Sequence, residues 1–211
     1  MNTILIILFF VILFLLVYLF NFQRYFQIRY NPDLSEYIRK YSNVKKIKCN
    51  SKIIISISCR TNNTYNLKPL LASLLDQTIR IDQIALNIPY KTKNGHVYDI
   101  DKEYENIVNI YRCGCDYEKY NNIIPTLLRE GDYGTIIISL DENVIYGKTF
   151  LEQLVVKSQE NNNCAIFFNE GILVKPEFFN SKILYAKQIV NIKKYIKSRS
   201  INFDYYENFK I

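Results

Sequence analysis

The sequence predicts an α/β fold in which helices cover both faces of a mostly parallel sheet, as in a three-layer sandwich. The first observation is a series of short runs rich in Ile, Val and Leu, which are typical of strands buried on both faces. The second is that segments with helical spacing of apolar residues, each about ten residues long, separate these runs. Strands that alternate with such helices form βαβ units, whose strands run parallel.

The apolar runs predict strands at Lys52–Ser58, Gln83–Pro89, Asn106–Cys113, Gly134–Asp141 and Cys164–Asn169, with a shorter extended piece at Ile172–Phe179. Helical spacing predicts helices between them, at Asn66–Thr78, Asn121–Glu130 and Lys148–Glu160. Pro125 falls in the first turns of the second helix, where its missing N–H does little harm. A short helix is also predicted at Leu34–Tyr41, and helical spacing recurs in the C-terminal tail, residues 182–211.

The N-terminal segment predicts a membrane anchor over residues 1–22. Ile4 to Phe20 contains no charged residue and no Gly, Pro or Ser. As a helix this run covers roughly 26 Å, which is close to the thickness of the hydrocarbon core. A signal peptide is the alternative, but no basic residue precedes the run and no small-residue cleavage site follows it. We therefore expect an uncleaved, single-pass anchor.

We expect the domain that follows the anchor to lie on the cytosolic side of the membrane, with the lumenal side as the alternative. Arg24 and Arg29 follow the anchor closely, and the positive-inside rule then favours the cytosol. The triplet Asn62–Thr64 matches an N-glycosylation acceptor, which favours a lumenal domain. We expect residues 23–50 to form a stalk and residues 51–181 to form the domain.

Composition excludes several classes of site. His96 is the only histidine and the five Cys are irregularly spaced, so a His-dependent triad or a zinc knuckle is not expected. The net charge is +7, but no nucleic-acid-binding motif accompanies it, and nucleic acid is not expected as a partner. Abundant Ile, Asn, Lys and Tyr have A/T-rich codons, which indicates an A/T-rich genome such as that of some large DNA viruses.

Topology predicts where a ligand would bind. Ligands of parallel sheets bind beyond the carboxyl ends of the strands. This rule selects the loops at Cys59–Asn66, Pro89–His96 and Asp141–Tyr146. The last loop carries the polar cluster Asp141-Glu142-Asn143 directly after an isoleucine run.

Three separate segments resemble the GT-A-type glycosyltransferases, which use nucleotide sugars. "IIISISCRTNNTYNLKPLLASLLDQTIRIDQIALNIP" resembles their opening strand, helix and second strand. "GTIIISLDENVIYGKTFLEQLV" is similar to their strand ending in a DxD motif and the helix after it. "NEGILVKPEFF" resembles the later acceptor-side segment. The resemblance covers Ile53 to Phe179 in this order.

The resemblance implies a sugar transferase with a nucleotide-sugar donor, a divalent cation (Mn²⁺ or Mg²⁺) and a lipid- or protein-linked acceptor. Such a cation clamps the diphosphate of the donor and stabilises its developing charge. The matching positions imply that Asp141, Glu142 and Asn143 hold the metal. They imply that Arg60, Thr61, Asp141 and Lys119 contact the nucleotide, and that Glu170 is the catalytic base.

An alternative from another functional class stays open. Asn143 stands where the family has a second Asp, and an amide removes one negative charge from the metal site. The segment "NSKILYAKQIVNIKKYIK", residues 180–197, holds no carboxylate where the base is expected. The alternative hypothesis is that the chain is a catalytically degraded relative that acts as a membrane-tethered binding or scaffold subunit.

Overall fold

The computed structural model describes residues 2–46, 49, 51–59, 67–91, 95, 97–98, 100–161, 164–168, 171–179, 192–199 and 201–206. Within the first helix, the side chains of Asn2, Val17, Phe20 and Asn21 are outside this description.

A seven-stranded sheet forms the centre of the molecule, in the order β3-β2-β1-β4-β6-β5-β7. The strands are β1 Ile53–Ser58, β2 Gln83–Pro89, β3 Asn109–Cys113, β4 Ile136–Leu140, β5 Ala165–Phe168, β6 Gly171–Val174 and β7 Phe203–Tyr205. β6 runs antiparallel to β4 and β5, while the other pairings are parallel. The predicted α/β fold with a mostly parallel sheet is confirmed.

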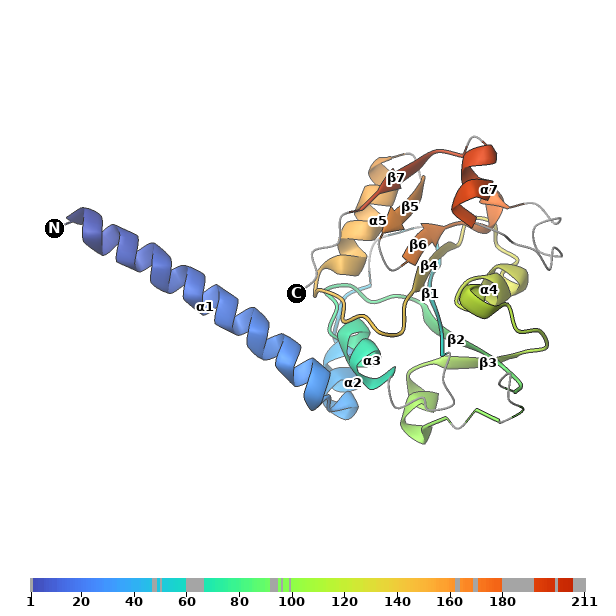
Figure 1. The fold of residues 1–211 in the computed structure, drawn as a ribbon, viewed down its shortest axis with the longest axis horizontal. Coiled ribbons are helices and arrows are strands. Elements are labelled where there is room, and N and C mark those ends of the chain that lie inside the picture. Colours follow the sequence, from blue (N-terminus) through green and yellow to red (C-terminus); the bar gives the residue numbers. More distant parts are fainter. Residues whose placement is uncertain are drawn as a thin grey trace.

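Helices and short 3₁₀ turns connect the strands (Figure 1). The helices are α1 Asn2–Tyr30, α2 Leu34–Ser42, α3 Lys68–Leu75, α4 Ile124–Arg129, α5 Phe150–Glu160 and α7 Ile192–Ser198; the 3₁₀ turns are η2 Lys102–Asn106, η3 Glu118–Tyr120 and η4 Pro176–Phe178. Pro residues lie in the first turns of α3 and α4, as expected for a residue without an N–H.

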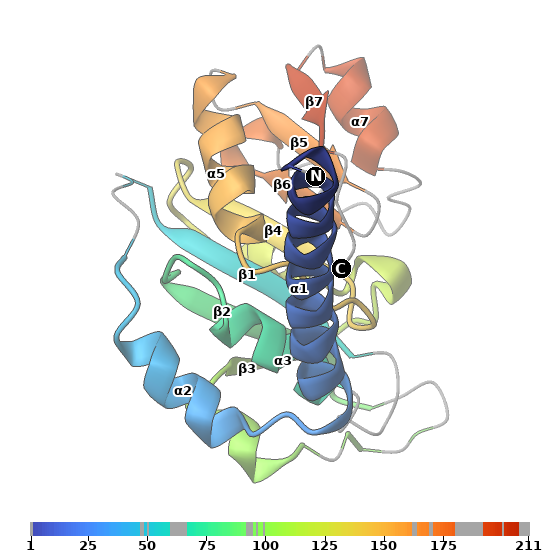
Figure 2. The same ribbon diagram turned by 90° about the vertical axis from the view of Figure 1, so that its left-hand side faces the viewer.

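Two apolar cores cover the two faces of the sheet, because successive strand residues point to opposite sides. Ile53, Ile55 and Ile57 of β1 belong to the larger core, which also takes residues from α2, α3 and α5. Ile137 of β4 belongs to the smaller core, which includes residues of α4 and α7. Figure 2 shows α3 and α5 in front of the sheet, on the same side as α1.

The reversal at β6 depends on a glycine. Gly171 pairs with Leu140, the last residue of β4. A Cβ atom at Gly171 would lie 2.0 Å from the Ser139 carbonyl oxygen and 2.5 Å from the Phe168 ring. Only glycine therefore lets β6 approach the end of β4 this closely.

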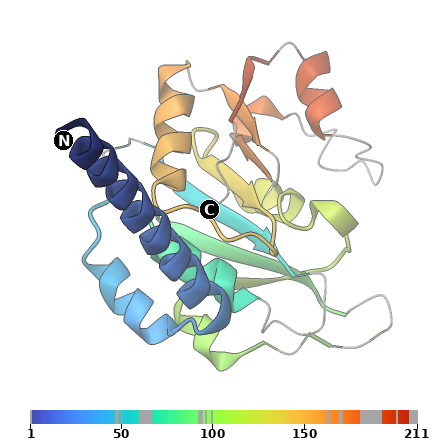
Figure 3. The ribbon, with the colours of Figure 1, turned by 60° about the vertical axis from the view of Figure 1, so that its left-hand side comes forward.

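The inner end of α1 is attached to the domain, whereas its outer half projects away from it (Figures 1 and 3). Ile28 is fully buried in the larger core. The Arg24 guanidinium donates to the Asp76 carboxylate at 2.7 Å, just after α3. The sequence predicts a membrane anchor here, yet no helix within the described residues is long and apolar enough to cross a membrane.

The segment expected as a stalk contributes to the globular part. Leu34 and Tyr37 of α2 are buried in the larger core. The Tyr41 hydroxyl accepts a hydrogen bond from the Ile81 N–H at 2.9 Å. Asp33 caps the helix by accepting from the N–H groups of Ser35 and Glu36. These contacts hold residues 28–41 against the same face of the sheet as α3.

Candidate functional site

The loop after β4 lies at the edge of the sheet where ligands are expected. β1 and β4 are parallel neighbours, paired from Ile53↔Ile136 to Ser56↔Ser139, so their carboxyl ends meet at one edge. The loop after β4, residues 141–147, is described in full. Of the other two predicted loops, residues 60–66 and several positions of 89–96 lie outside the described residues.

The predicted cluster forms a tight turn. Asp141 Oδ1 accepts hydrogen bonds from the Asn143 backbone N–H at 2.9 Å and from Asn143 Nδ2 at 3.1 Å. This is the local geometry that Asp adopts at turns. Asp141 and Glu142 are half-buried and Asn143 is exposed. The turn keeps the three side chains at the strand end, and it uses the amide nitrogen of Asn143, not its oxygen, in the bond to Asp141.

Tyr146 anchors this loop to the body of the protein. Its side chain is fully buried and stacks on Phe150, with ring centroids 4.6 Å apart. Its hydroxyl accepts from the Asp141 N–H at 3.2 Å, and its own N–H donates to Ser73 Oγ at 3.2 Å. Its carbonyl oxygen accepts from Arg24 at 3.3 Å. One residue therefore connects the polar turn to α3 and α1.

Gln77 fixes the far end of the same loop. Its Nε2 donates to the Gly147 carbonyl at 2.7 Å and to the Ser73 carbonyl at 2.9 Å. Its Oε1 accepts from the Leu151 N–H at 3.0 Å, in the first turn of α5. Ser73 and Gln77, both in the segment "LLASLLDQT" of residues 70–78, thus hold the site loop.

Further polar groups gather next to the turn. Burial raises the pKa of Tyr98, and the nearby Cys59, Asp116 and Glu142 raise it further. Asn122 Nδ2 donates to the Leu140 carbonyl at 3.3 Å, just before Asp141. Sequence reasoning missed Tyr98 and Tyr146, because nothing in an aromatic-rich chain distinguishes these two tyrosines from the rest.

Lys119, predicted to contact the nucleotide, lies on η3. It is exposed, and its ammonium lies 5.0 Å from the centroid of the Tyr120 ring. Among the described residues, no contact joins Lys119 to Asp141. The predicted residues Arg60, Thr61 and Glu170 lie outside the described residues.

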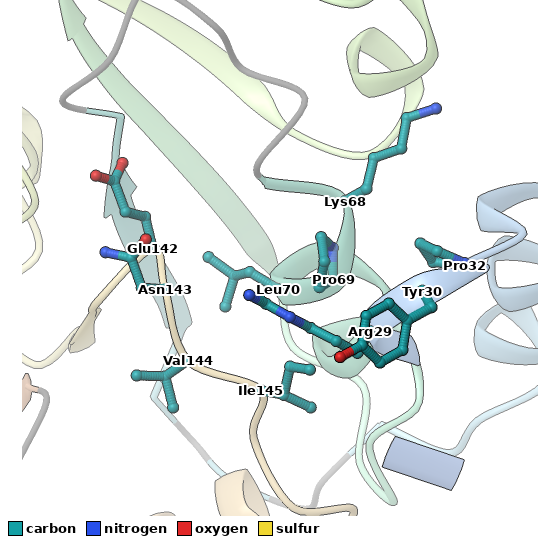
Figure 4. Close-up of a pocket in the computed structure, with 10 residues that line it drawn as sticks. All are labelled: Arg29, Tyr30, Pro32, Lys68, Pro69, Leu70, Glu142, Asn143, Val144 and Ile145. Atoms are coloured by element: carbon teal, nitrogen blue, oxygen red, sulfur yellow. The ribbon is translucent and has the colours of Figure 1, made fainter. Parts of the chain in front are cut away.

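A cavity of about 530 Å³ opens beside the turn (Figure 4). Its walls come from three places: the end of α1, the first turn of α3, and the loop after β4. Its lining residues are Arg29, Tyr30, Pro32, Lys68, Pro69, Leu70, Glu142, Asn143, Val144 and Ile145. Two members of the predicted metal set, Glu142 and Asn143, thus line a cavity that the sequence did not connect with α1.

The oxygen atoms at the turn are suited to binding a hard cation that is shared with a substrate. Within the described residues, no three His, Cys, Asp or Glu side chains form a group that could hold a metal ion. Asp141 and Glu142 offer carboxylate oxygens and Asn143 an amide oxygen, which are the ligands that hard cations prefer. Mg²⁺ is commonly bound by one or two carboxylates together with substrate phosphates and water. The three side chains of the turn suit this shared mode, in which substrate phosphates and water complete the coordination.

No protein-family model matches the sequence, and no curated protein matches it. Several solved structures are similar to the chain, among them two nucleotidyl-group enzymes by their descriptions. One is a 4-diphosphocytidyl-2C-methyl-D-erythritol synthase from Anaerococcus prevotii, at 13% identity and a TM-score of 0.47, over 76% of this chain and 90% of that one. The other is the 2-C-methyl-D-erythritol 4-phosphate cytidylyltransferase from Francisella tularensis, at 12% identity and a TM-score of 0.48, over 76% of this chain and 94% of that one. Neither is described as a glycosyltransferase, and likeness at this level assigns no activity.

Proposed function

We propose that the chain is a membrane-associated transferase that takes a sugar from a nucleotide sugar. The observation that carries the proposal is the loop after β4, where Tyr146 and Gln77 hold a turn of hard oxygen donors at the carboxyl edge of the sheet. A turn anchored in this way is preorganised, because its backbone is held in place before a ligand binds.

In this proposal the turn would bind a divalent cation together with the diphosphate of the donor. Asp141, Glu142 and the Asn143 amide oxygen would hold the cation, which would stabilise the charge on the leaving phosphates. An acceptor oxygen forms a bond to the anomeric carbon of the sugar. The bond from that carbon to the diphosphate breaks, and the nucleoside diphosphate leaves with the electron pair. For a hydroxyl acceptor, Glu170 stays the predicted base.

Membrane association rests on the exposed surface of α1. The side chains from Ile4 to Leu16 are apolar, and between 46% and 72% of each is exposed. Soluble monomers rarely present so large a continuous apolar surface to water. A lipid phase that surrounds this half of α1 would remove that surface from water.

The rival function is a scaffold subunit without catalysis. It is favoured by the hydrogen bonds from Asn143 to Asp141 Oδ1, because one carboxylate oxygen is then occupied within the protein. The two functions differ in whether a nucleotide and a cation bind together at the turn.

Calorimetric titration of the full chain in detergent micelles with UDP-glucose and GDP-mannose, with and without Mn²⁺, tests the proposal. We expect one of them to bind in a Mn²⁺-dependent way, and Asp141→Ala to weaken that binding at least about tenfold, since charge-assisted contacts contribute about 1.5–3 kcal/mol. Asp132→Ala is the matched control, because Asp132 Oδ1 accepts from the Gly134 N–H in a similar turn before β4. Absence of binding by either nucleotide would favour the scaffold.

Membrane association has its own test. The full chain should remain with phosphatidylcholine vesicles after extraction at alkaline pH, because its apolar side chains stay buried in lipid. Phe10→Asp combined with Leu13→Asp should release it, since a charged side chain in the hydrocarbon is costly, by about 2.5–3.5 kcal/mol each. Extraction of the unsubstituted chain would contradict the proposed association.

A further inference from the structure

An aromatic stripe connects the apolar half of α1 to the cavity at the turn. Phe22, Phe26 and Tyr30 are spaced four residues apart, so they lie on one face of the helix. The ring centroids of Phe22 and Phe26 are 5.6 Å apart, and those of Phe26 and Tyr30 are 4.5 Å apart. All three are exposed, at 52%, 51% and 67%. Since Tyr30 also lines the cavity, the stripe ends inside it.

Arg29 supplies positive charge where the stripe ends. In Figure 4 its guanidinium points across the cavity towards the loop that carries Val144 and Ile145. No ion pair reaches Arg29 among the residues that the structure describes. The other lining cation, Lys68, points away from the loop and pairs with Glu103 at 2.9 Å and Asp101 at 3.8 Å. Arg29 is thus the cation available to a ligand in the cavity.

The remaining walls divide the cavity into two chemically different parts. Leu70, Val144 and Ile145 form an apolar wall beside Arg29. Glu142 lies at the opposite end, and its carboxylate points away from the guanidinium. A ligand with an anionic group at Arg29 and a hydrocarbon portion leaving along the stripe would match this arrangement.

We propose that this cavity binds the phosphate head group of a long-chain lipid monophosphate, whose hydrocarbon chain lies along Phe22 and Phe26. Arg is well suited to a phosphate because its planar fork donates two parallel hydrogen bonds. The lipid enters from the phase around the outer half of α1, so the head group reaches the turn without leaving the membrane surface. The role of the lipid as an acceptor rests on the proposed function, whereas its binding does not.

A phosphate acceptor also accounts for an unusual feature of the sequence. Residues 180–197 hold no carboxylate, although a hydroxyl acceptor requires a base. A phosphate monoester is mostly dianionic at neutral pH, since its second pKa is about 6. Its oxygen can form the bond to the anomeric carbon while the bond to the diphosphate breaks and the nucleoside diphosphate leaves with the electron pair. No proton has to pass to the protein in this step.

The experiment uses the full chain in dodecyl maltoside micelles and a hexadecyl phosphate that carries a photoreactive diazirine. Cross-linked peptides are identified by mass spectrometry, and binding is measured by competition with unlabelled hexadecyl phosphate, hexadecanol or inorganic phosphate. No nucleotide is added, so the result is independent of the titrations with nucleotide sugars. Arg29→Gln and Phe26→Ala are the variants, and Arg39→Gln, at an exposed arginine of α2, is the matched control.

We expect cross-links in residues 22–30 and 142–145, and competition by hexadecyl phosphate that is at least tenfold stronger than by hexadecanol. Arg29→Gln should abolish that preference. Phe26→Ala should weaken the binding of both hexadecyl phosphate and hexadecanol a few-fold, and Arg39→Gln should leave the binding of both unchanged. Equal competition by hexadecanol, or full preference in Arg29→Gln, overturns the proposal. Inorganic phosphate that competes as well as hexadecyl phosphate also overturns it, since the site would then recognise free phosphate.

The two proposals fail separately. If nucleotide sugars bind in an Asp141-dependent way but hexadecyl phosphate does not, only the lipid site is wrong. If hexadecyl phosphate binds through Arg29 but no nucleotide sugar binds, the lipid site stands and the transferase is wrong.

Discussion

Two polar clusters of the sheet use similar side chains for different purposes. Between the sheet and α4, Ser56, Asn87 and Thr126 are buried and bond to one another: Ser56 Oγ and Thr126 Oγ1 are 2.6 Å apart, and Asn87 Nδ2 donates to both at 3.0 and 2.9 Å. At the carboxyl edge, the donors of Asp141 and Glu142 are half-buried beside a cavity.

The difference shows that a polar residue in an apolar run is not by itself a site. The polar groups of the inner cluster are satisfied by one another and by Arg129, which donates to Asn87 Oδ1 at 3.0 Å and to Thr126 Oγ1 at 3.3 Å. The cluster therefore stabilises the fold. The edge cluster lies at a strand end, where Glu142 and Asn143 line a cavity that a ligand can enter. Position relative to the strand end separates the two roles better than residue type does.

The largest expected effect on stability tests how firmly the loop after β4 is anchored at the carboxyl edge of the sheet. Tyr146→Ala removes a fully buried, stacked ring and should lower the free energy of unfolding by about 4 kcal/mol, as measured by urea denaturation. Tyr146→Phe keeps the ring and loses only the hydroxyl that accepts from Asp141, so it should cost about 1 kcal/mol. Equal losses for the two variants would mean that the ring does not anchor the loop.

A second variant tests the close approach of β6 to the edge. Gly171→Ala places a Cβ atom 2.0 Å from the Ser139 carbonyl oxygen, a backbone atom that cannot rotate away. We expect a loss of about 3 kcal/mol in the free energy of unfolding. Gly114→Ala is the control, since a Cβ there meets nothing within 4 Å. Similar stabilities of the two variants would contradict the close approach.

The inner cluster should affect stability alone. Asn87→Ala leaves Ser56 and Thr126 without their shared donor and should cost about 2 kcal/mol in urea denaturation. Nucleotide and lipid binding, measured where the variant is fully folded, should be unchanged, because no residue of the cluster belongs to the turn or lines the cavity. A variant that folds normally but loses ligand binding would remove the distinction between the two clusters.

The smallest expected effect lies at the opposite edge of the sheet. Burial opposes ionisation of Asp82, but hydrogen bonds from Lys46 and from the Ile53 N–H outweigh it, so its pKa is lowered. The stabilisation is therefore present above the unfolded pKa of about 3.9 and is lost as pH falls through the folded pKa. Asp82→Asn should cost about 1 kcal/mol at pH 7 and about nothing near pH 2. A difference between the two proteins that persists unchanged in acid would contradict this ion-pair role.

Much of the fold follows from local sequence patterns, whereas the reversed strand does not. Gln83–Pro89 forms the strand that its apolar run predicts, and Asp141 lies at a strand end as expected. The antiparallel course of β6 depends on a contact between Gly171 and Ser139, which are far apart in the sequence. Helical spacing was predicted for the tail, residues 182–211, but Phe203–Tyr205 of that tail forms β7, which pairs with β5.

The candidate site, too, could be predicted only where its residues are adjacent in the sequence. The polar turn was predicted because its residues are adjacent in the sequence. Its partners are not: Ser73 and Arg24 reach Tyr146 from two other helices. The cavity was missed for the same reason, since α1 was expected to end before the domain and instead supplies Arg29 and Tyr30 to the wall.

Because α1 is one continuous helix from Asn2 to Tyr30, the orientation of its outer half fixes the orientation of the domain attached to its inner end. Each residue of a helix advances it by about 1.5 Å and turns it by about 100°. One residue inserted between Leu19 and Phe22 would therefore rotate the outer half by about that angle relative to Arg24 and Ile28, which hold the inner end. A membrane or protein surface that binds the outer half of α1 therefore also determines the direction in which the cavity opens.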